Sequence, residues 1–304
     1  FSKLLHKDMS ELNSADINDW QKEREKIGIA YQTIRRDFGA LKTMLNSAVQ
    51  ENVISSNPLT SHKLIEPSNE QQSSAKERAK KADAKRRLLT KDEIQGISIG
   101  LEMYAKDLIR KNINSRKHGK SYLADYTKLN YPHWFIPYCH LAMHTGLRPG
   151  DLYSLTWEEL NLQYGRLIKE CEKSHNARRR NRQPAIVDMK LNSTIKNVLE
   201  KWHEDLGKPD KGLVFPSPVT GTQLDKQAHR KPWNHVKEFG EFDMQLDFYA
   251  LRHHFISAQL ANGVPIFTVA KLAGHKSIDM IAQHYGHQCP DRAIEAIDII
   301  TSSL

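Results

Sequence analysis

Apolar side chains recur every three to four residues in the segment 30–52, and this spacing predicts an amphipathic helix. The stripe consists of Ile34, Phe38, Leu41, Leu45, Ala48 and Val49. The opposite face carries Arg35, Arg36 and Lys42, which either face a polyanion or form an ordinary solvated surface. With a shorter helix before it, this segment predicts a small helical unit over residues 1–60.

A polar segment separates this unit from the rest of the chain. Residues 61–88 are rich in Ser, Gln, Glu and Lys and have few large apolar groups, which is typical of a linker. Its basic end includes Arg86 and Arg87, which either follow a phosphate backbone or belong to a solvated helix. Thr90 and Glu93 form a capping-box pattern, which predicts that a helix opens a second domain.

The second domain, residues 89–304, combines helical periodicity with one hairpin pattern. Residues 134–145 predict an apolar helix, whereas residues 165–189 alternate apolar and polar positions around a turn and predict a β-hairpin. The polar, basic residues 104–130 are interpreted as a surface insertion, and the apolar tail, residues 291–304, needs a partner surface. The expected fold class is therefore mainly α with a small β-sheet or hairpin.

A turn at residues 145–157 presents an arginine before a helix. Arg148 lies in the turn, and Pro149 suits the first helical position. Asp151 then falls in the first turn, where a carboxylate complements the helix dipole. The same pattern fits a purely structural Arg148–Asp151 ion pair.

The most strongly patterned segment is 248–287, where apolar helical periodicity is broken at Asn262-Gly263 and Ala273-Gly274. Three polar residues lie beside the breaks or on the flanking helices: Arg252, His275 and Tyr285. Each alone has an ordinary structural explanation. Together they predict convergence on one site, where a tyrosine beside cationic groups indicates a nucleophile aimed at a phosphate.

Composition narrows the class of partner. The 304 residues carry 45 Lys and Arg against 36 Asp and Glu, a formal net charge of +9, which favours a polyanion. The sequence has no apolar run long enough to cross a bilayer, so no membrane partner is expected. Three widely spaced cysteines lack zinc-ligand spacing and indicate reduced thiols in an intracellular protein. The chain starts at Phe1, so a fragment of a longer protein is expected.

These residues suit the breaking and rejoining of a phosphodiester. A tyrosine retains the phosphate as a covalent ester, so neither metal nor any other cofactor is required. Arginines such as Arg148 and Arg252 pair with the phosphate oxygens. A lysine on the hairpin, Lys173, is placed to protonate the leaving 5′ oxygen.

Three motifs resemble those of the tyrosine recombinases, or phage-type integrases. HTGLRPGDLYSLTW is similar to the first arginine box, YALRHHF to the second, and LAGHKSIDMIAQHYGH to the box that carries the nucleophile. The resemblance implies catalytic roles for Arg148, Arg252, His275 and Tyr285. It further implies a helical core-binding domain and an α+β catalytic domain that clamp DNA from opposite sides.

One position departs from the family pattern, because Tyr249 replaces the usual histidine before the second arginine. A phenol is a poor base at neutral pH, although Tyr249 can still donate to a phosphate oxygen. Asp151 and His253 are expected to support the site. Lys173 is assigned by its hairpin position, with Lys169 and Arg178 as weaker substitutes.

The resemblance implies a site-specific recombinase that integrates or excises a mobile element through a 3′-phosphotyrosyl intermediate. Implied partners are double-stranded DNA attachment sites, three further protomers in a tetramer, and DNA-bending accessory proteins. A cytoplasmic, nucleoid-associated location in a prokaryote or phage-infected cell is expected. The residues predicted to contact DNA are Arg35, Arg36, Lys42, Arg86, Arg87, Arg178 and Arg179.

Two other functions fit the same residues. A type IB topoisomerase uses the same chemistry on one duplex, although the small helical domain and short last box resemble recombinases more closely. A catalytically inactive DNA-binding regulator is favoured only by Tyr249.

Overall fold

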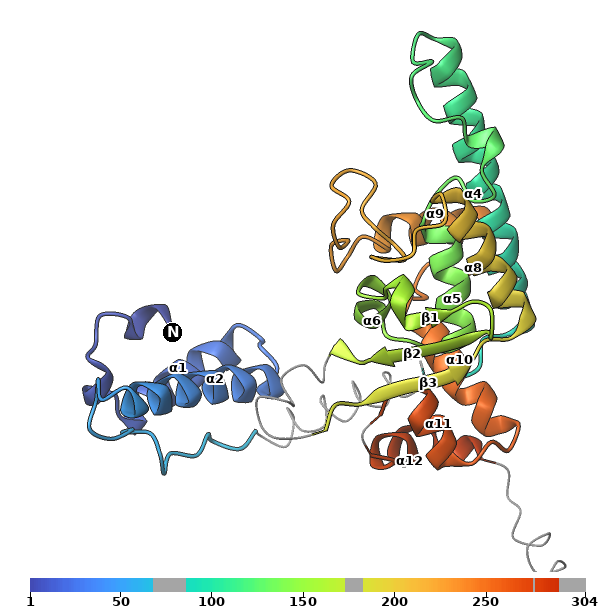
Figure 1. Cartoon of the computed structure of the whole chain (residues 1–304). Helices are drawn as coiled ribbons and strands as arrows, with labels where there is room; N and C mark the ends of the chain where they lie inside the picture. Colours follow the sequence, from blue (N-terminus) through green and yellow to red (C-terminus); the bar gives the residue numbers. More distant parts are fainter. Residues whose placement is uncertain (68–85, 173–182, 276, 290–304) are drawn as a thin grey trace, which may run out of the picture. The chain divides into compact units, whose positions relative to one another are not determined.

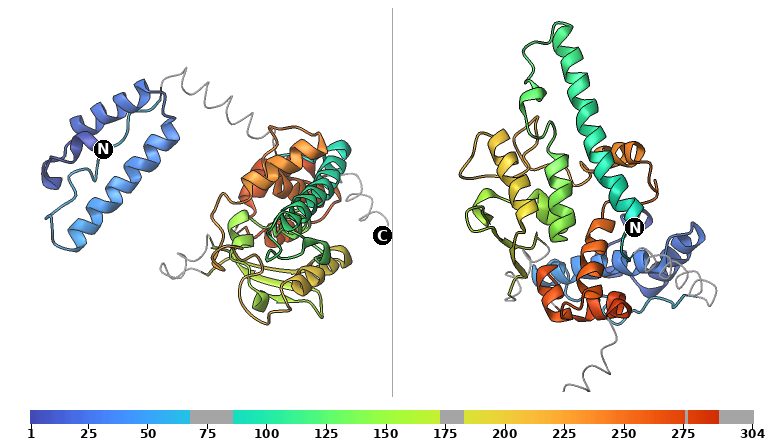
Figure 2. Two further views of the ribbon diagram at one scale, coloured as in Figure 1. Left: turned by 90° about the horizontal axis from the view of Figure 1, so that it is seen from above. Right: turned by 90° about the vertical axis from the view of Figure 1, so that its right-hand side faces the viewer.

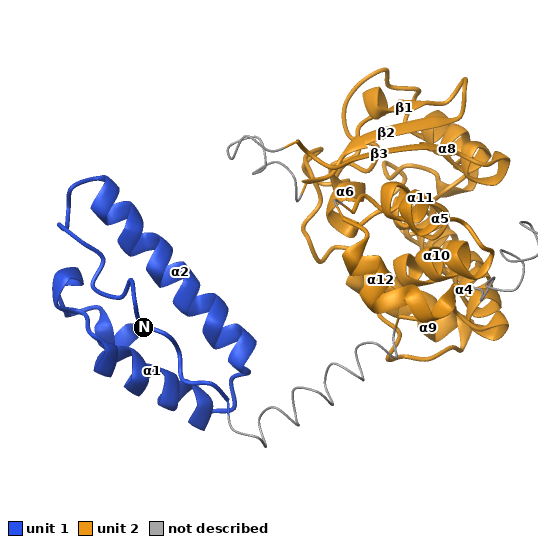
Figure 3. Ribbon diagram, turned by 90° about the horizontal axis from the view of Figure 1, so that it is seen from below, with its two compact units in different colours: residues 1–82 blue, residues 83–304 orange. Residues whose placement is uncertain are grey.

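The computed structural model describes residues 1–67, 86–172, 183–275 and 277–289. The chain forms two compact units, Phe1–Ala82 and Asp83–Leu304 (Figure 3). Both are mainly helical, and the second contains a small antiparallel sheet (Figure 1). The expected fold class is confirmed.

The first unit is a helical pair, α1 (Ser14–Lys26) and α2 (Tyr31–Gln50), preceded by the short 3₁₀ turns Ser2–Leu4 and Met9–Glu11. Asn13 caps α1, because its side chain accepts from the first-turn amides. The predicted stripe of α2 forms the core with residues of α1 and its flanks. The buried members are Leu12, Ile17, Trp20, Ile34, Phe38, Leu41, Leu45 and Leu59.

Both described edges of the predicted linker are bonded to a unit. Gln21, which is fully buried, donates to the carbonyl of Ile65 at 2.7 Å and accepts from its amide at 2.9 Å. Residues 61–65 therefore lie against the first unit. Just beyond the other edge, the backbone amide of Leu89 donates to Nδ1 of His254 at 3.1 Å and so bonds the start of the second domain to α10.

Helix α4 (Lys91–Lys117) opens the second unit with the predicted capping box. It continues through the first half of the segment interpreted as a surface insertion, and Figure 2 shows it as one long helix. The side-chain amide of Asn112 donates through Nδ2 to the carbonyl of Ala124, and its Oδ1 accepts from the backbone amide of Tyr126. The chain after α4, including the 3₁₀ turn Tyr126–Lys128, is thereby held against the helix.

Helix α9 (Arg230–Gly240) packs closely across α4. Glycine permits this approach, since a Cβ atom at Gly100 would lie 2.1 Å from the carbonyl oxygen of Val236. The crossing is a backbone-to-backbone contact that no larger residue allows.

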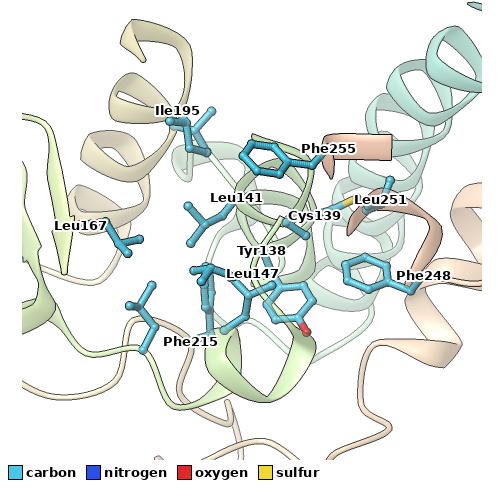
Figure 4. Close-up of a cluster of buried hydrophobic side chains, with 14 of the residues drawn as sticks. Tyr138, Cys139, Leu141, Leu147, Leu167, Ile195, Phe215, Phe248, Leu251 and Phe255 are labelled. Carbon is cyan, nitrogen blue, oxygen red and sulfur yellow. The ribbon is translucent and has the colours of Figure 1, made fainter. Parts of the chain in front are cut away.

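The main core surrounds α5 (Phe135–Thr145), whose residues pack against α6 (Pro149–Tyr153), α8 (Ser193–Asp205) and α10 (Ala250–Ala261). Aromatic rings from these elements stack at its centre. Tyr138 lies 5.2 Å from Tyr153 and 5.3 Å from Phe248 between ring centroids. Figure 4 shows Phe248, Leu251 and Phe255 of the α10 region facing α5.

The sheet is antiparallel in the order β1-β2-β3, with β1 Leu160–Asn161, β2 Arg166–Glu170 and β3 Ile186–Lys190. The 3₁₀ turn Trp157–Glu159 leads into it. Strands β2 and β3 pair with Ile168 opposite Asp188, which confirms the predicted hairpin.

The second arginine box and the box that carries the candidate nucleophile lie on α10, α11 (Ile266–Leu272), α12 (Asp279–Tyr285) and the turns between them. The 3₁₀ turn Gly286–Gln288 follows α12. Asn262 is the C-cap residue of α10 and Ala273 that of α11, so both predicted breaks are confirmed.

Candidate active site

Arg252 is the buried centre of the site, with 3% of its surface exposed. Its Nη1 donates to the carbonyl of Gly146 at 2.6 Å, and its Nη2 donates to the carbonyl of Ala273 at 2.7 Å. Gly146 and Ala273 are the C-cap residues of α5 and α11. The guanidinium therefore joins three helices and has a fixed orientation.

His275 is bonded to this guanidinium. Nη2 of Arg252 donates to Nε2 of His275 at 2.8 Å. A guanidinium only donates, so Nε2 accepts and the imidazole proton lies on Nδ1. Two of the predicted catalytic residues are thus in direct contact, across the turn that ends α11.

Arg148 lies beside them, with 15% of its side chain exposed. Its Nη1 donates to the carbonyl of Gly274 at 3.2 Å and lies 3.7 Å from Oδ2 of Asp151. Gly274 has a left-handed φ of +63°, and a Cβ there would lie 2.5 Å from Sγ of Cys171. Glycine is therefore required at position 274, where its carbonyl accepts from Arg148.

Asp151 connects Arg148 to the hairpin. Its carboxylate is 2% exposed, and Oδ1 accepts from the amide of Glu172 at 2.8 Å. The residues that follow β2 are thereby held beside Arg148. Lys173, the predicted general acid, is the next residue and lies outside the described residues, as do Arg178 and Arg179.

Lys169, the weaker substitute for Lys173, is occupied on the inner face of the sheet. It is 4% exposed. Its Nζ lies 3.0 Å from the carboxylate of Glu159 and 2.9 Å from the carbonyl of Ser154. This ion pair gives Lys169 a structural explanation.

The hydroxyl of Tyr285 forms a hydrogen bond with Nδ1 of His253. Tyr285 ends α12 and is 5% exposed, and its ring centroid lies 5.8 Å from that of His253. Tyr249 packs against the same imidazole, edge to face, with 5.1 Å between the ring centroids. His253 follows Tyr249 by one helical turn, which brings both to the same face.

Burial sets the electrostatics of these groups. It lowers the pKa of Arg252 to about 10, with the neighbouring charge of Arg148 adding to the effect. Arg252 therefore remains protonated at neutral pH. Burial raises the pKa of Tyr285 to about 12, although Arg252 acts in the opposite direction, and it lowers the pKa of His253 to about 4.

The basic end of the predicted linker lies against α12 and the 3₁₀ turn that follows it. Nη1 of Arg86 lies 2.8 Å from Nδ1 of His284, and its carbonyl accepts from the side-chain amide of Gln288. Arg87 instead forms a two-pronged pair with Glu93, at 2.7 and 2.8 Å. The contacts of Arg86 were not predicted, because no local pattern links a linker residue to one almost two hundred positions away.

The predicted DNA-facing residues of the first unit lie on α2. Arg35 and Arg36 are exposed, and Arg36 lies 3.5 Å from Asp37. Lys42 is half-buried and donates to the carbonyl of Thr60 at 2.7 Å.

Within the described ranges, no cluster of three or more His, Cys, Asp and Glu side chains is arranged to hold a metal ion. Cys139 and Cys171 are buried free thiols, and Cys289 is an exposed one. A search of the described helices finds none with the length and apolar character needed to cross a membrane.

A family model described as the phage integrase family matches residues 125–292. This range includes all three motif boxes and covers more than half of the chain. The chain belongs to the phage integrase family. The resemblance drawn from Arg148, Arg252, His275 and Tyr285 is confirmed at the level of the family.

Relatives of this integrase-family chain include a tyrosine recombinase XerC-like protein of Caldanaerobacter subterraneus subsp. tengcongensis. It is 22% identical over 333 residues, which cover 98% of this chain and 73% of that protein. The integrase of Salmonella phage P22 is 28% identical over 167 residues, covering 51% of this chain and 39% of that protein. The chain thus spans well under half of the P22 protein.

Solved structures of similar fold include the Tn1549 transposon integrase in complex with transposon right end DNA. It has a TM-score of 0.55 at 16% identity and covers 97% of this chain and 87% of that chain. A lambda integrase dimer bound to a COC′ core site has a TM-score of 0.53 at 15% identity, covering 91% and 81%. At these identities the likeness concerns the fold.

Proposed function

We propose that this chain is a site-specific DNA recombinase that cleaves and rejoins DNA through a 3′-phosphotyrosyl intermediate. The observation that carries the proposal is the contact of two residue pairs around one site, Arg252 with His275 and Tyr285 with His253. Arg148 lies beside the first pair, held by the carbonyl of Gly274.

In the cleavage step, Oη of Tyr285 attacks the scissile phosphorus, and the bond to O5′ breaks. Negative charge grows on the two non-bridging oxygens, where Arg148, Arg252 and His275 stabilise it. Lys173 donates a proton to the leaving O5′. A 5′-hydroxyl from the partner strand then attacks the phosphotyrosyl ester and reverses the step, so the bond energy is retained without ATP or metal.

The substrate that we propose is a pair of DNA attachment sites of a mobile element, bound by four protomers. Family membership and the transposon and phage relatives support this context. Arg35 and Arg36 on α2 are proposed to contact the DNA backbone, since both are exposed. Lys42 and Arg87 are weaker candidates, because each already has a protein acceptor.

The test uses nicked duplexes that carry the junctions flanking the gene, incubated in EDTA with the wild-type protein and with Tyr285→Phe. A denaturing gel is expected to show a protein–DNA band with the wild type alone. Site-specific binding without a band would support the inactive regulator. Relaxation of a plasmid that lacks the junctions would support the topoisomerase.

A further inference from the structure

The residue that contacts the nucleophile is His253, which lies one helical turn beyond the position of the usual family histidine. Nδ1 of His253 meets the hydroxyl of Tyr285. Tyr249, at the usual histidine position, packs its ring edge-on against His253 and is 38% exposed. The imidazole that contacts Tyr285 therefore comes from His253 and not from the position that Tyr249 occupies.

We propose that His253 is the proton acceptor for Tyr285 in DNA cleavage. The inference rests on the proposed function and names a further catalytic residue for it. As the bond between Oη and phosphorus forms and the bond to O5′ breaks, the phenol proton moves to Nδ1 of His253. In rejoining, the same proton returns to Tyr285 as the phosphotyrosyl ester is broken.

The proposal specifies which form of the imidazole is present. The proposal requires the neutral tautomer whose ring proton lies on Nε2, because only then does Nδ1 accept from the phenol. Burial, helped by the neighbouring charges of Arg86 and Arg252, lowers the pKa of His253 to about 4. A neutral acceptor is thus present throughout the neutral pH range.

The same burial keeps the nucleophile inactive before DNA binds. With the pKa of Tyr285 at about 12, the proton stays on the phenol in the free protein. A scissile phosphate changes both partners, since its negative charge favours the imidazolium and the forming bond makes the phenol proton acidic. Proton transfer to His253 then accompanies attack rather than preceding it.

The decisive experiment distinguishes the proton transfer from Tyr285 to His253 from the proton transfer to the leaving O5′. Suicide duplexes are prepared with an ordinary scissile phosphate and with a 5′-bridging phosphorothiolate, whose sulfur leaves without protonation. Single-turnover rates of covalent adduct formation are compared for the wild type, His253→Gln, His253→Ala and Lys173→Ala. His235→Gln is the matched control, because His235 lies partly exposed on α9.

We expect His253→Gln to slow adduct formation about 100-fold on both substrates, which is within the usual range for removing an acid or base. The defect of Lys173→Ala is expected to disappear with the phosphorothiolate. Added imidazole should partly restore His253→Ala, which a purely structural role would not allow. Unfolding temperatures and DNA affinity of all variants are measured in parallel to show that folding and binding are retained.

Wild-type rates in His253→Gln, or a defect that the phosphorothiolate removes, would overturn the assignment of His253. Failure of the wild type to form any adduct would overturn the proposed function itself, and the inference with it. The two failures are therefore distinguishable.

Discussion

The guanidinium of Arg252 shows how single residues prepare this site. It is almost fully buried, yet its donors meet two backbone carbonyls and the imidazole of His275. These bonds fix the guanidinium, so the N–H groups that they leave over need no reorganisation when charge develops on a bound phosphate. Burial alone would favour the neutral form, but with a pKa of about 10 the group stays charged at neutral pH.

A second residue-scale pair predicts how stability changes with pH. Glu93 accepts two bonds from Arg87, which lower the pKa of its carboxyl from 4.5 to about 2, and its side chain is only 10% exposed. Because the folded-state pKa is the lower one, the stabilisation is complete above about pH 4.5 and is lost as the pH falls toward 2. It amounts to about 3 kcal/mol.

We therefore expect Glu93→Gln to reduce the free energy of unfolding by about 3 kcal/mol at pH 7 and by about half as much at pH 3. Urea unfolding at both pH values measures the difference. Glu102→Gln is the control, since its pair with Lys106 is exposed. An effect of Glu93→Gln that is the same at both pH values would contradict the account.

At the scale of elements, the crossing of α4 and α9 makes a separate prediction. At Gly100, a methyl group would meet backbone rather than a flexible side chain. We expect Gly100→Ala to destabilise the second unit by about 1–3 kcal/mol, because overpacking outweighs the higher helix propensity of alanine.

The matched variant is Gly39→Ala in α2, where a Cβ atom would meet nothing within 4 Å. There we expect alanine to stabilise the first unit by about 0.5–1 kcal/mol. Thermal unfolding followed by calorimetry measures both. A Gly100→Ala protein as stable as the wild type would show that the two helices separate without cost.

For the whole molecule, the excess of positive charge predicts salt-dependent binding to DNA. Each phosphate contact releases counterions, so the double variant Arg35→Gln, Arg36→Gln is expected to make the slope of log K against log salt shallower by about 1–2. Fluorescence anisotropy with a duplex at several salt concentrations measures this. Lys208→Gln, which removes one exposed positive charge from the second unit, is the control, as Lys208 pairs with Glu204. An equal change per charge removed in this control would refute a specific role for α2.

Local patterns sufficed to predict most elements of the fold. The helix of α2, the capping box at Thr90, the hairpin and both breaks after α10 and α11 follow from residues close in sequence. The full length of α4 did not follow from local patterns, because the second half of the helix is polar. That half is held by the side chain of Asn112, which bonds to the chain that follows the helix.

The sequence by itself determined the family, and it predicted Arg148, Arg252, His275 and Tyr285 as the candidate site, because motif boxes and turn residues are local and specific. The tertiary structure decided what holds them. The carbonyl of Gly146 lies 106 positions from Arg252, and backbone carbonyls carry no signature of residue type. It also decided that His253 contacts Tyr285, because only the packing of α12 on α10 brings the phenol to that imidazole.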